Sequence, residues 1–337
     1  MAEVILSKLT KSFGKTVALD GIDMVVPDGA FVVLLGPTGA GKTTTLRLIA
    51  GLERPDAGDI RIAGQSVLAD IPAQRDVAMV FQQYSLYPHL TVRENLAFPL
   101  RSPVLAWPED AITRRVAEVA EALRIAHKLD NKSTALSGGE MQRVSIGRAL
   151  VRSPRIYLMD EPLSSLDAKL RGDLRIELKR IHRDLGATFL YVTHDQIEAM
   201  TMATHVGVLD QGRLVQFGTP RAVYEDPASA YVATRLGQPR INLLPAAAFP
   251  GAPAGAVQIG LRPEHIALGQ GHGLGQGQAA EVQRVEHLGD QTRLHLSMAG
   301  HALVTLADPH TPLRAGAVVA VAPVAPLWFD ASGNRVH

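Results

Sequence analysis

The segment from residue 31 to residue 50 constrains the fold of this chain more than any other. Residues 31–35 form an apolar run that predicts a strand, and residues 44–50 continue as a predicted helix. The connection reads Gly36, Pro37, Thr38, Gly39, Ala40, Gly41, Lys42, Thr43, Thr44. Its glycines allow backbone angles that aim successive N–H groups at one anion, and the helix start adds a positive dipole end. The segment therefore predicts a nucleotide phosphate site, in which Lys42 meets the β- and γ-phosphates and Thr43 ligates Mg²⁺.

Charge and composition narrow the classes of partner. The chain has 34 Lys and Arg against 33 Asp and Glu, so its net charge of +1 predicts no nucleic acid partner. It has no cysteine, which excludes disulfides and thiolate metal sites. No apolar run approaches the ~18–20 residues that a membrane span needs, and residues 1–8 lack the apolar core of a signal peptide. We expect a soluble chain whose role at a membrane is peripheral.

Polar residues follow three predicted strands at the point where each strand ends. Gln82 follows the apolar run 77–81, Asp160 and Glu161 follow the apolar residues 156–159, and His194 follows the run 188–193. The carboxyl ends of strands in an α/β sheet converge on one edge, where such folds bind ligands. Asp160 is placed to hold Mg²⁺, and Glu161 is a candidate general base for an attacking water. The alternative that the two acids only cap a strand stays open.

A helical insert separates these strands. Residues 91–127 show helical periodicity, and Pro108 can occupy a first helical position. A second glycine-containing turn then precedes a helix: Leu136, Ser137, Gly138, Gly139, Glu140. It offers another helix N-terminus that can bind an anion. Earlier in the chain, Phe13 lies in a predicted loop, where its ring either packs or stacks on a purine.

The composition changes near residue 237, where glycine and proline become frequent. Short alternating segments follow at 257–262, 279–287, 291–298, 301–307 and 317–324. Such strands predict a small β-barrel without a catalytic constellation of its own. We therefore expect two domains, residues 1–235 with a helical insert at about 88–152, and residues 236–337.

These motifs, in this order, resemble those of the ATP-binding-cassette (ABC) ATPases. The resemblance rests on GPTGAGKT at 36–43, Gln82, LSGGE at 136–140, LMDEP at 158–162, SSLD at 164–167 and His194. Residues 82–90, 240–245 and 260–265 further resemble the maltose and glycerol-3-phosphate class of importer ATPases, whose C-terminal tail is a regulatory barrel. The implied fold class is α/β, a P-loop cassette with a helical subdomain, followed by a small all-β OB-like (TOBE-type) domain.

The resemblance implies how one subunit holds its ligands, ATP and Mg²⁺. Phe13 stacks on adenine, while Lys42 and the backbone amides of residues 36–44 hold the phosphates. Thr43, Gln82 and Asp160 organise the Mg²⁺ ion.

The resemblance also implies a site that is shared between two subunits. Glu161 polarises the attacking water, and His194 contacts the γ-phosphate. Ser137 and Gly139 contact the γ-phosphate bound to the opposite subunit, and Asp167 communicates across the same interface. Closing two halves around ATP can then switch hydrolysis on, because phosphoryl transfer depends mostly on positioning and charge stabilisation.

The implied partners are a second ATPase subunit in a homodimer, two integral-membrane permease subunits and an extracytoplasmic solute-binding protein. Residues 84–90 resemble the region that receives the permease's coupling helix, which places the chain peripherally on the cytoplasmic face of the inner membrane. The resemblance favours a sugar or a glycerol-3-phosphate-like solute. Import of a polyamine, sulfate or iron is the alternative. A soluble ABC ATPase acting on nucleic acid or ribosomes is disfavoured by the single cassette, the short insert and the near-neutral charge.

One residue departs from the family's pattern. The glycine-containing turn ends in Glu140, where the family usually has Gln. A carboxylate suits the dipole of its own helix but reduces the attraction of that N-terminus for phosphates. We expect an altered affinity for ATP and retained function.

Overall fold

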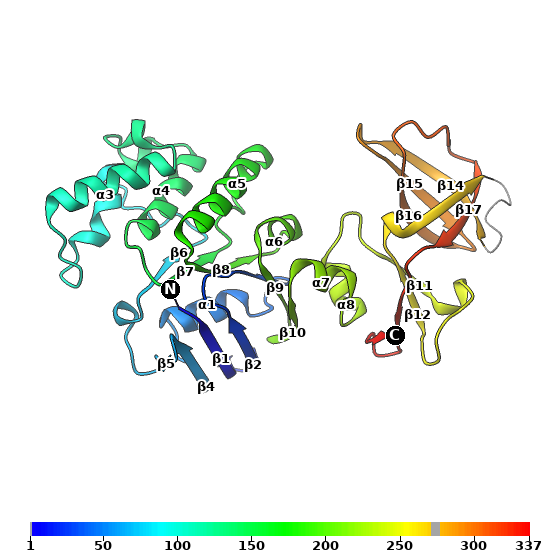
Figure 1. The fold of residues 1–337 in the computed structure, drawn as a ribbon, viewed down its shortest axis with the longest axis horizontal. Coiled ribbons are helices and arrows are strands. Elements are labelled where there is room, and N and C mark those ends of the chain that lie inside the picture. The colour runs from blue at the N-terminus through cyan, green and yellow to red at the C-terminus, as the bar shows by residue number, and fades with distance from the viewer. Residues whose placement is uncertain (1, 271–276) are drawn as a thin grey trace. The chain divides into compact units, whose positions relative to one another are not determined.

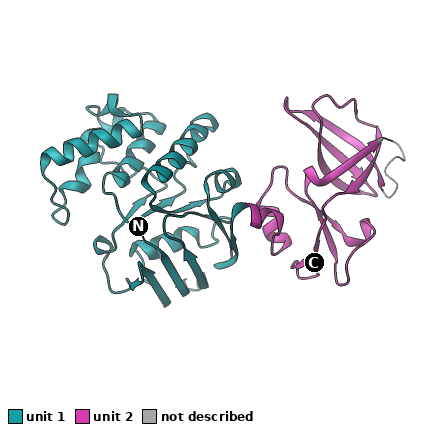
Figure 2. Cartoon of the chain, in the orientation of Figure 1, with its two compact units in different colours: residues 1–220 teal, residues 221–337 magenta. Residues whose placement is uncertain are grey.

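The structure is a computed structural model that describes residues 2–270 and 277–337. The chain divides into two compact units, residues 1–220 and residues 221–337 (Figure 2). The expected domain boundary after residue 235 falls inside the second unit, and we keep it as a proposal for where the functional domains divide.

The first unit is built around a six-stranded sheet with the order β10-β9-β3-β8-β7-β6 (Figure 1). Its strands are β3 (Phe31–Leu35), β6 (Val77–Val80), β7 (Ile156–Asp160), β8 (Thr188–Thr193), β9 (His205–Asp210) and β10 (Arg213–Gly218). All of these strands are parallel except β10, which forms a hairpin with β9. Every residue of β3, β7 and β8 is buried, as expected for central parallel strands that are covered on both faces.

A second, antiparallel sheet has the order β2-β1-β4-β5. It comprises β1 (Val4–Phe13), β2 (Thr16–Val26), β4 (Ala57–Ile62) and β5 (Gln65–Ser66). Helix α1 (Lys42–Ala50) lies between the two sheets and shares one apolar core with both (Figure 1). The prediction that Phe13 lies in a loop is wrong, because Phe13 pairs with Thr16 at the end of β1.

Helices cover the other side of the central sheet and form the insert. They are α2 (Val92–Ala97), α3 (Glu109–Ala122), α4 (Gly138–Leu150), α5 (Ala168–Leu185) and α6 (Gln196–Met202). Figure 1 shows α3 and α4 side by side in the insert, and α5 and α6 above the sheet. The helical pattern expected over 91–127 is present, and it is divided into α2 and α3. Helix α2 ends at Ala97 because Pro99 follows, and Pro108 precedes α3 in an extended conformation.

The second unit begins within α7 (Pro220–Glu225), continues with α8 (Ala230–Arg235) and is otherwise made of two sheets. One has the order β11-β12-β18-β19 and the other β13-β17-β14-β15-β16. Their strands are β11 (Asn242–Pro245), β12 (Gln258–Leu261), β13 (Ile266–Gln270), β14 (Gln278–His287), β15 (Thr292–Met298), β16 (His301–Ala307), β17 (Val318–Pro323), β18 (Leu327–Phe329) and β19 (Arg335–Val336). The five predicted strands correspond to β12, β14, β15, β16 and β17. The other four were missed, because they have two to five residues each and too little alternation to recognise.

Arg262 joins α7 and α8 to the sheets of the second unit. Its side chain is 1% exposed, and its guanidinium lies 3.8 Å from the ring centroid of Tyr224. It donates hydrogen bonds to the carbonyl oxygens of Ala233, Leu236 and Tyr224. One buried cation therefore satisfies the backbone groups at the ends of both helices.

Replacing Arg262 with Leu is expected to destabilise the second unit by about 3 kcal/mol or more, because three carbonyl oxygens lose a buried charged donor. Urea unfolding measured by the fluorescence of Trp328, in a Trp107→Phe background, reports on this unit. The control is Arg314→Leu, which removes an exposed arginine from the same unit and should change stability by about 0.5 kcal/mol at most. Equal midpoints for the two variants would contradict the role given to Arg262.

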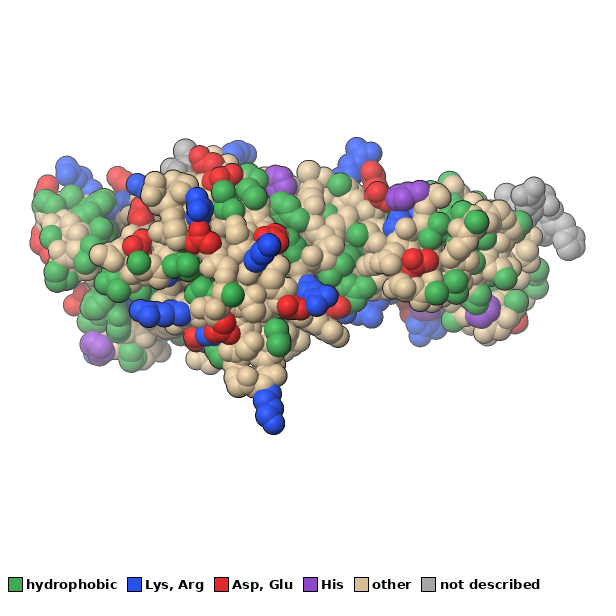
Figure 3. All heavy atoms as spheres, turned by 90° about the horizontal axis from the view of Figure 1, so that it is seen from below, with side chains coloured by type: hydrophobic (Ala, Val, Ile, Leu, Met, Phe, Trp, Pro, Cys, Tyr) green, Lys and Arg blue, Asp and Glu red, His purple; other side chains and the backbone are tan. Residues whose placement is uncertain are grey.

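The face drawn in Figure 3 carries acidic and basic side chains interspersed with apolar ones. This face shows no extended patch of Lys and Arg side chains of the kind that a polyanion binds. No helix within the described residues is long and apolar enough to cross a bilayer.

Candidate functional site

The loop between β3 and α1 depends on glycine at its tightest point. Gly41 is the N-cap of α1 with a φ of 98°, and a Cβ there would lie 2.5 Å from Leu19 Cδ2 and 2.6 Å from the Ala18 carbonyl oxygen. Gly39 also has a positive φ, of 83°. Only glycine meets both requirements at Gly41, the left-handed backbone and the close approach to β2. The loop therefore wraps the N-terminus of α1 in a form that can surround an anion.

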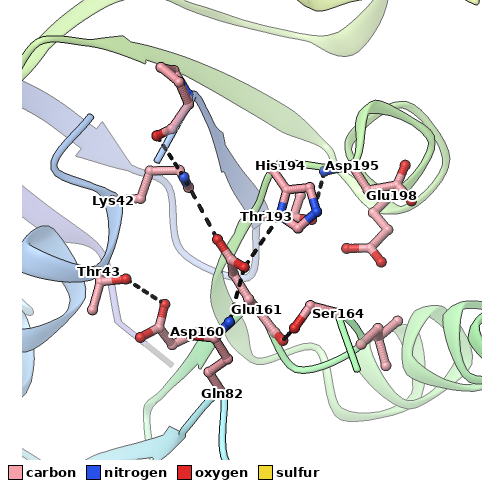
Figure 4. A network of polar contacts seen from close by, with 12 residues as sticks. Lys42, Thr43, Gln82, Asp160, Glu161, Ser164, Thr193, His194, Asp195 and Glu198 are labelled. Carbon is pink, nitrogen blue, oxygen red and sulfur yellow. Dashed lines mark hydrogen bonds and ion pairs between the residues drawn. The ribbon is translucent and has the colours of Figure 1, made fainter. Parts of the chain in front are cut away.

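Lys42 is the first residue of α1, and only 5% of its surface is exposed. Its Nζ donates to the carbonyl oxygens of Gly36 (2.9 Å) and Pro37 (3.0 Å), and it lies 3.7 Å from Oε1 of Glu161 (Figure 4). Burial lowers the pKa of Lys42, while the nearby carboxylates of Glu161 and Asp160 oppose that shift. The ammonium group is thus held where a phosphate can replace its carboxylate neighbour.

Thr43 and Asp160 form a second pair beside the lysine. The Thr43 hydroxyl donates to Oδ1 of Asp160 at 2.8 Å, and Asp160 is the buried last residue of β7. Burial raises the pKa of the Asp160 carboxyl, and the hydrogen bond from Thr43 opposes this. No group of three or more His, Cys, Asp or Glu among the described residues could hold a metal. Mg²⁺ at a phosphate site needs only one or two carboxylates besides phosphates and waters, so this hydroxyl and carboxylate fit it.

Glu161 follows β7 in a conformation that is uncommon for a non-glycine residue, with a φ of 43°. Its N–H donates to the Val192 carbonyl oxygen at 3.0 Å, and its own carbonyl oxygen accepts from the Ser164 hydroxyl at 2.9 Å. These bonds hold a strained backbone and aim the side chain into the site (Figure 4). Strain of this kind clusters at functional sites.

The carboxylate of Glu161 is where three strand ends meet. Besides Lys42, it contacts Gln82, whose Nε2 lies 3.4 Å from Oε2, and His194, whose Nδ1 lies 3.3 Å from Oε2 (Figure 4). Gln82 follows β6 and His194 follows β8. The structure thus brings together the residues expected at this edge of the sheet. Gln82 contacts Glu161 here, whereas its predicted role as a ligand of the metal stays a proposal.

The turn before α4 forms a separate constellation. Ser137 is the N-cap of α4, and Oε2 of Glu140 accepts from both the Ser137 N–H (2.9 Å) and its hydroxyl (3.0 Å). A Cβ on Gly139 would lie 2.1 Å from Cδ2 of Leu170, so glycine is needed where α5 approaches. In the described residues, the side-chain bonds of Ser137 and Glu140 run to each other and to Lys128 rather than to the Lys42 site.

Of the remaining predicted residues, Phe13 and Asp167 lie outside both constellations, and Gly138 belongs to the start of α4. Phe13 is 47% exposed at the end of β1, with Nζ of Lys11 at 5.2 Å from its ring centroid. Asp167 is the N-cap of α5, where its carboxylate accepts from the Leu170 N–H at 3.0 Å. Gly138 lies near Tyr84, whose hydroxyl would be 3.3 Å from a Cβ at that position.

Sequence reasoning missed polar residues that support the site. The Thr193 hydroxyl accepts from the Asp195 N–H at 3.0 Å, just after His194. Glu198 is 2% exposed, and its carboxylate accepts a hydrogen bond of 2.8 Å from the hydroxyl of Tyr191 in β8. Burial raises the pKa of the Glu198 carboxyl. A signal for Glu198 was present, because it shares the buried side of α6 with Ala199 and Met202.

Comparison with known families agrees with this architecture. The family described as ABC transporter matches residues 19–164, and the TOBE domain family matches residues 259–328. Among solved structures, the dimeric MJ0796 cassette of a bacterial ABC transporter is 29% identical, with a TM-score of 0.59, over 65% of this chain and 99% of that one. The cassette MJ1267 is 27% identical, with a TM-score of 0.62, over 69% of this chain and 98% of that one.

Similar curated proteins span the whole chain. The sn-glycerol-3-phosphate import ATP-binding protein UgpC of Rhizobium meliloti (strain 1021) is 45% identical over 100% of both chains. The sulfoquinovosyl glycerol transport ATP-binding protein SmoE of Agrobacterium fabrum is 44% identical over 99% of both. The expected fold class, a cassette followed by a TOBE domain, is confirmed. The chain therefore belongs to the ATP-binding subunits of ABC transporters, a family of ATPases that bind ATP.

Proposed function

We propose that this chain is the ATP-hydrolysing subunit of a bacterial ABC importer, which dimerises around two ATP molecules to drive uptake of a sugar or glycerol-3-phosphate-like solute. The observation that carries the proposal is the position of Glu161, whose carboxylate lies between Lys42 and His194 next to the phosphate loop. Two full-length relatives are named as an sn-glycerol-3-phosphate import protein and a sulfoquinovosyl glycerol transport protein. These names support the proposed class of solute.

Within one chain, the proposed chemistry follows from these contacts. Lys42 and the loop N–H groups bind and orient the phosphates of ATP, and Phe13 stacks on the adenine. Thr43 and Asp160, with Gln82, would hold the Mg²⁺ ion, which neutralises charge on the phosphates when bound. Glu161 accepts a proton from the attacking water, and His194 contacts the γ-phosphate. The hydrogen bonds on both sides of Glu161 hold the base in place before ATP arrives.

We further propose that the turn before α4 serves the ATP bound to a second copy. Ser137 and Gly139 would present the N-terminus of α4, which has thirteen residues, to that phosphate. Asp167, the N-cap of α5, accepts from the N–H of Leu170, whose side chain lies against Gly139, and Asp167 would lie at the same interface. The support is that Ser137 and Glu140 bond to each other and to Lys128, apart from the Lys42 site of their own chain.

The proposed membrane partners are two permease subunits that work with an extracytoplasmic solute-binding protein, and the chain acts at the cytoplasmic face of the inner membrane. A groove of about 240 Å³ in the first unit supports a docking site for the permease's coupling helix. Its lining includes Phe81, which directly precedes Gln82, and Arg148 of α4, so a helix seated there would lie next to the proposed metal ligand. Its lining is mainly apolar and includes Met79, Phe81, Tyr84, Phe98, Pro99 and Ala149.

The test is isolation of the chain with its permeases, followed by ATPase assays in proteoliposomes with the solute-binding protein. We expect sn-glycerol-3-phosphate or a sugar glycoside of glycerol to stimulate hydrolysis. Stimulation only by a polyamine, sulfate or iron would support the proposed importer function but contradict the proposed solute. Isolation with ribosomes in place of membranes would overturn the importer itself.

A further inference from the structure

Glu140 places a negative charge where the proposed function needs to bind one. Its Oε2 accepts from both the N–H and the hydroxyl of Ser137. A serine hydroxyl has one proton, so while it donates to Glu140 it cannot donate to a phosphate. The Ser137 N–H, followed by Lys128, lowers the pKa of the Glu140 carboxyl, which keeps it charged at neutral pH. Uncompensated, this charge would oppose an anion at the start of α4.

Lys128 supplies the compensation from a different part of the insert. Its Nζ lies 3.1 Å from Oε1 of Glu140, the oxygen that does not cap Ser137. The two side chains are 28% and 25% exposed, so solvent screens this pair less than a fully exposed one. Arg143, the next basic residue on α4, is instead paired with Glu177.

The backbone of Lys128 is held in place as well. Its N–H donates to the Ile125 carbonyl oxygen at 2.9 Å, and its own carbonyl oxygen accepts from the Asn131 N–H at 2.9 Å. Lys128 thus projects from an ordered 3₁₀ turn, Ala126–Lys128, that follows α3. The ammonium group reaches Glu140 from a defined position.

We propose that Lys128 is a positioning residue for the shared nucleotide site: it cancels the charge of Glu140 and holds Oε1, so that the N-terminus of α4 keeps its affinity for the phosphates of ATP on a second copy. This inference rests on the proposed function. The summed charge of Lys128 and Glu140 at the start of α4 is zero. We expect a change in this sum to change the ATP concentration at which two chains dimerise.

The experiment uses the full chain carrying Glu161→Gln, in which we expect turnover of bound ATP to be strongly reduced, and measures ATP-dependent dimerisation by light scattering. Lys128→Gln should raise the half-saturating ATP concentration about three- to tenfold, because it leaves Glu140 uncompensated. Lys128→Arg keeps the charge and should stay near the parent value. Adding Glu140→Gln to Lys128→Gln makes the pair neutral again and should restore that value, whereas Glu140→Gln alone should lower it. Without the Glu161 substitution, KM for ATP should move with little change in kcat.

Lys132→Gln is the matched control, because it removes an exposed lysine only four residues away. An equal effect from Lys132→Gln would show general electrostatics and overturn the inference. So would a Lys128→Gln defect that persists with Glu140→Gln, since it would indicate a structural role. If the parent chain does not dimerise with ATP at all, the proposed shared site fails, and that outcome is distinct from these two.

Discussion

Replacing Glu161 with Gln is expected to reduce the steady-state rate of ATP hydrolysis by about 10²- to 10⁴-fold, because an amide cannot accept the proton of the attacking water. ATP binding should persist. Lys42 keeps its bonds to the Gly36 and Pro37 carbonyl oxygens, and the Thr43 and Asp160 pair does not involve Glu161. The measurements are phosphate release at saturating MgATP and equilibrium binding by calorimetry.

The matched control is Glu109→Gln. It removes an exposed carboxylate of α3 that pairs with Arg101. Its kcat should equal that of the parent chain. Undiminished turnover in the Glu161 variant would remove the proposed base. A joint loss of binding and unfolding cooperativity would show instead that the residue supports its strained turn, where φ is 43°.

Replacing Lys42 with Ala is expected to weaken ATP binding by about 10- to 100-fold, because a charge-assisted bond to phosphate contributes about 1.5–3 kcal/mol. Hydrolysis should fall at least as far, since bound phosphates would lose their main positive partner. The Glu161 carboxylate also loses its lysine neighbour and keeps Gln82 and His194. Calorimetry with and without Mg²⁺ measures the loss.

Lys15→Ala serves as the control, because it removes an exposed lysine from the turn after β1. Its affinity for ATP should match that of the unsubstituted chain. Urea unfolding of both variants checks that the fold is retained. Unchanged affinity in Lys42→Ala would contradict the proposed phosphate site.

Some features could be predicted because they depend on neighbouring residues. Residues 31–50 carry the strand, the glycine loop and the helix in one continuous segment, and the structure has β3 and α1 there. The polar residues after β6, β7 and β8 could be placed on one edge because parallel strands share the direction of their ends. The family resemblance and the fold class are confirmed, since each motif retains its local order.

Other features could not be predicted, because they depend on segments that are far apart in the sequence. Strands β11, β13 and β18 are short and pair with strands that are distant in the sequence, so local alternation gave no signal. Arg262 lies in a segment that resembles the family's sequence pattern. Its burial against α7 and α8 could not be predicted from that pattern, because it depends on the tertiary fold.

The sequence by itself determined that this chain binds nucleotide phosphates, because the required residues lie next to one another around Lys42. Only the tertiary structure decided what surrounds each charge. It placed Oε1 of Glu161 3.7 Å from Nζ of Lys42, which is 119 residues away in the sequence. It also placed Nζ of Lys128 3.1 Å from Oε1 of Glu140. A motif specifies backbone form over a few residues, whereas an ion pair depends on the distance between separate segments, which packing alone sets.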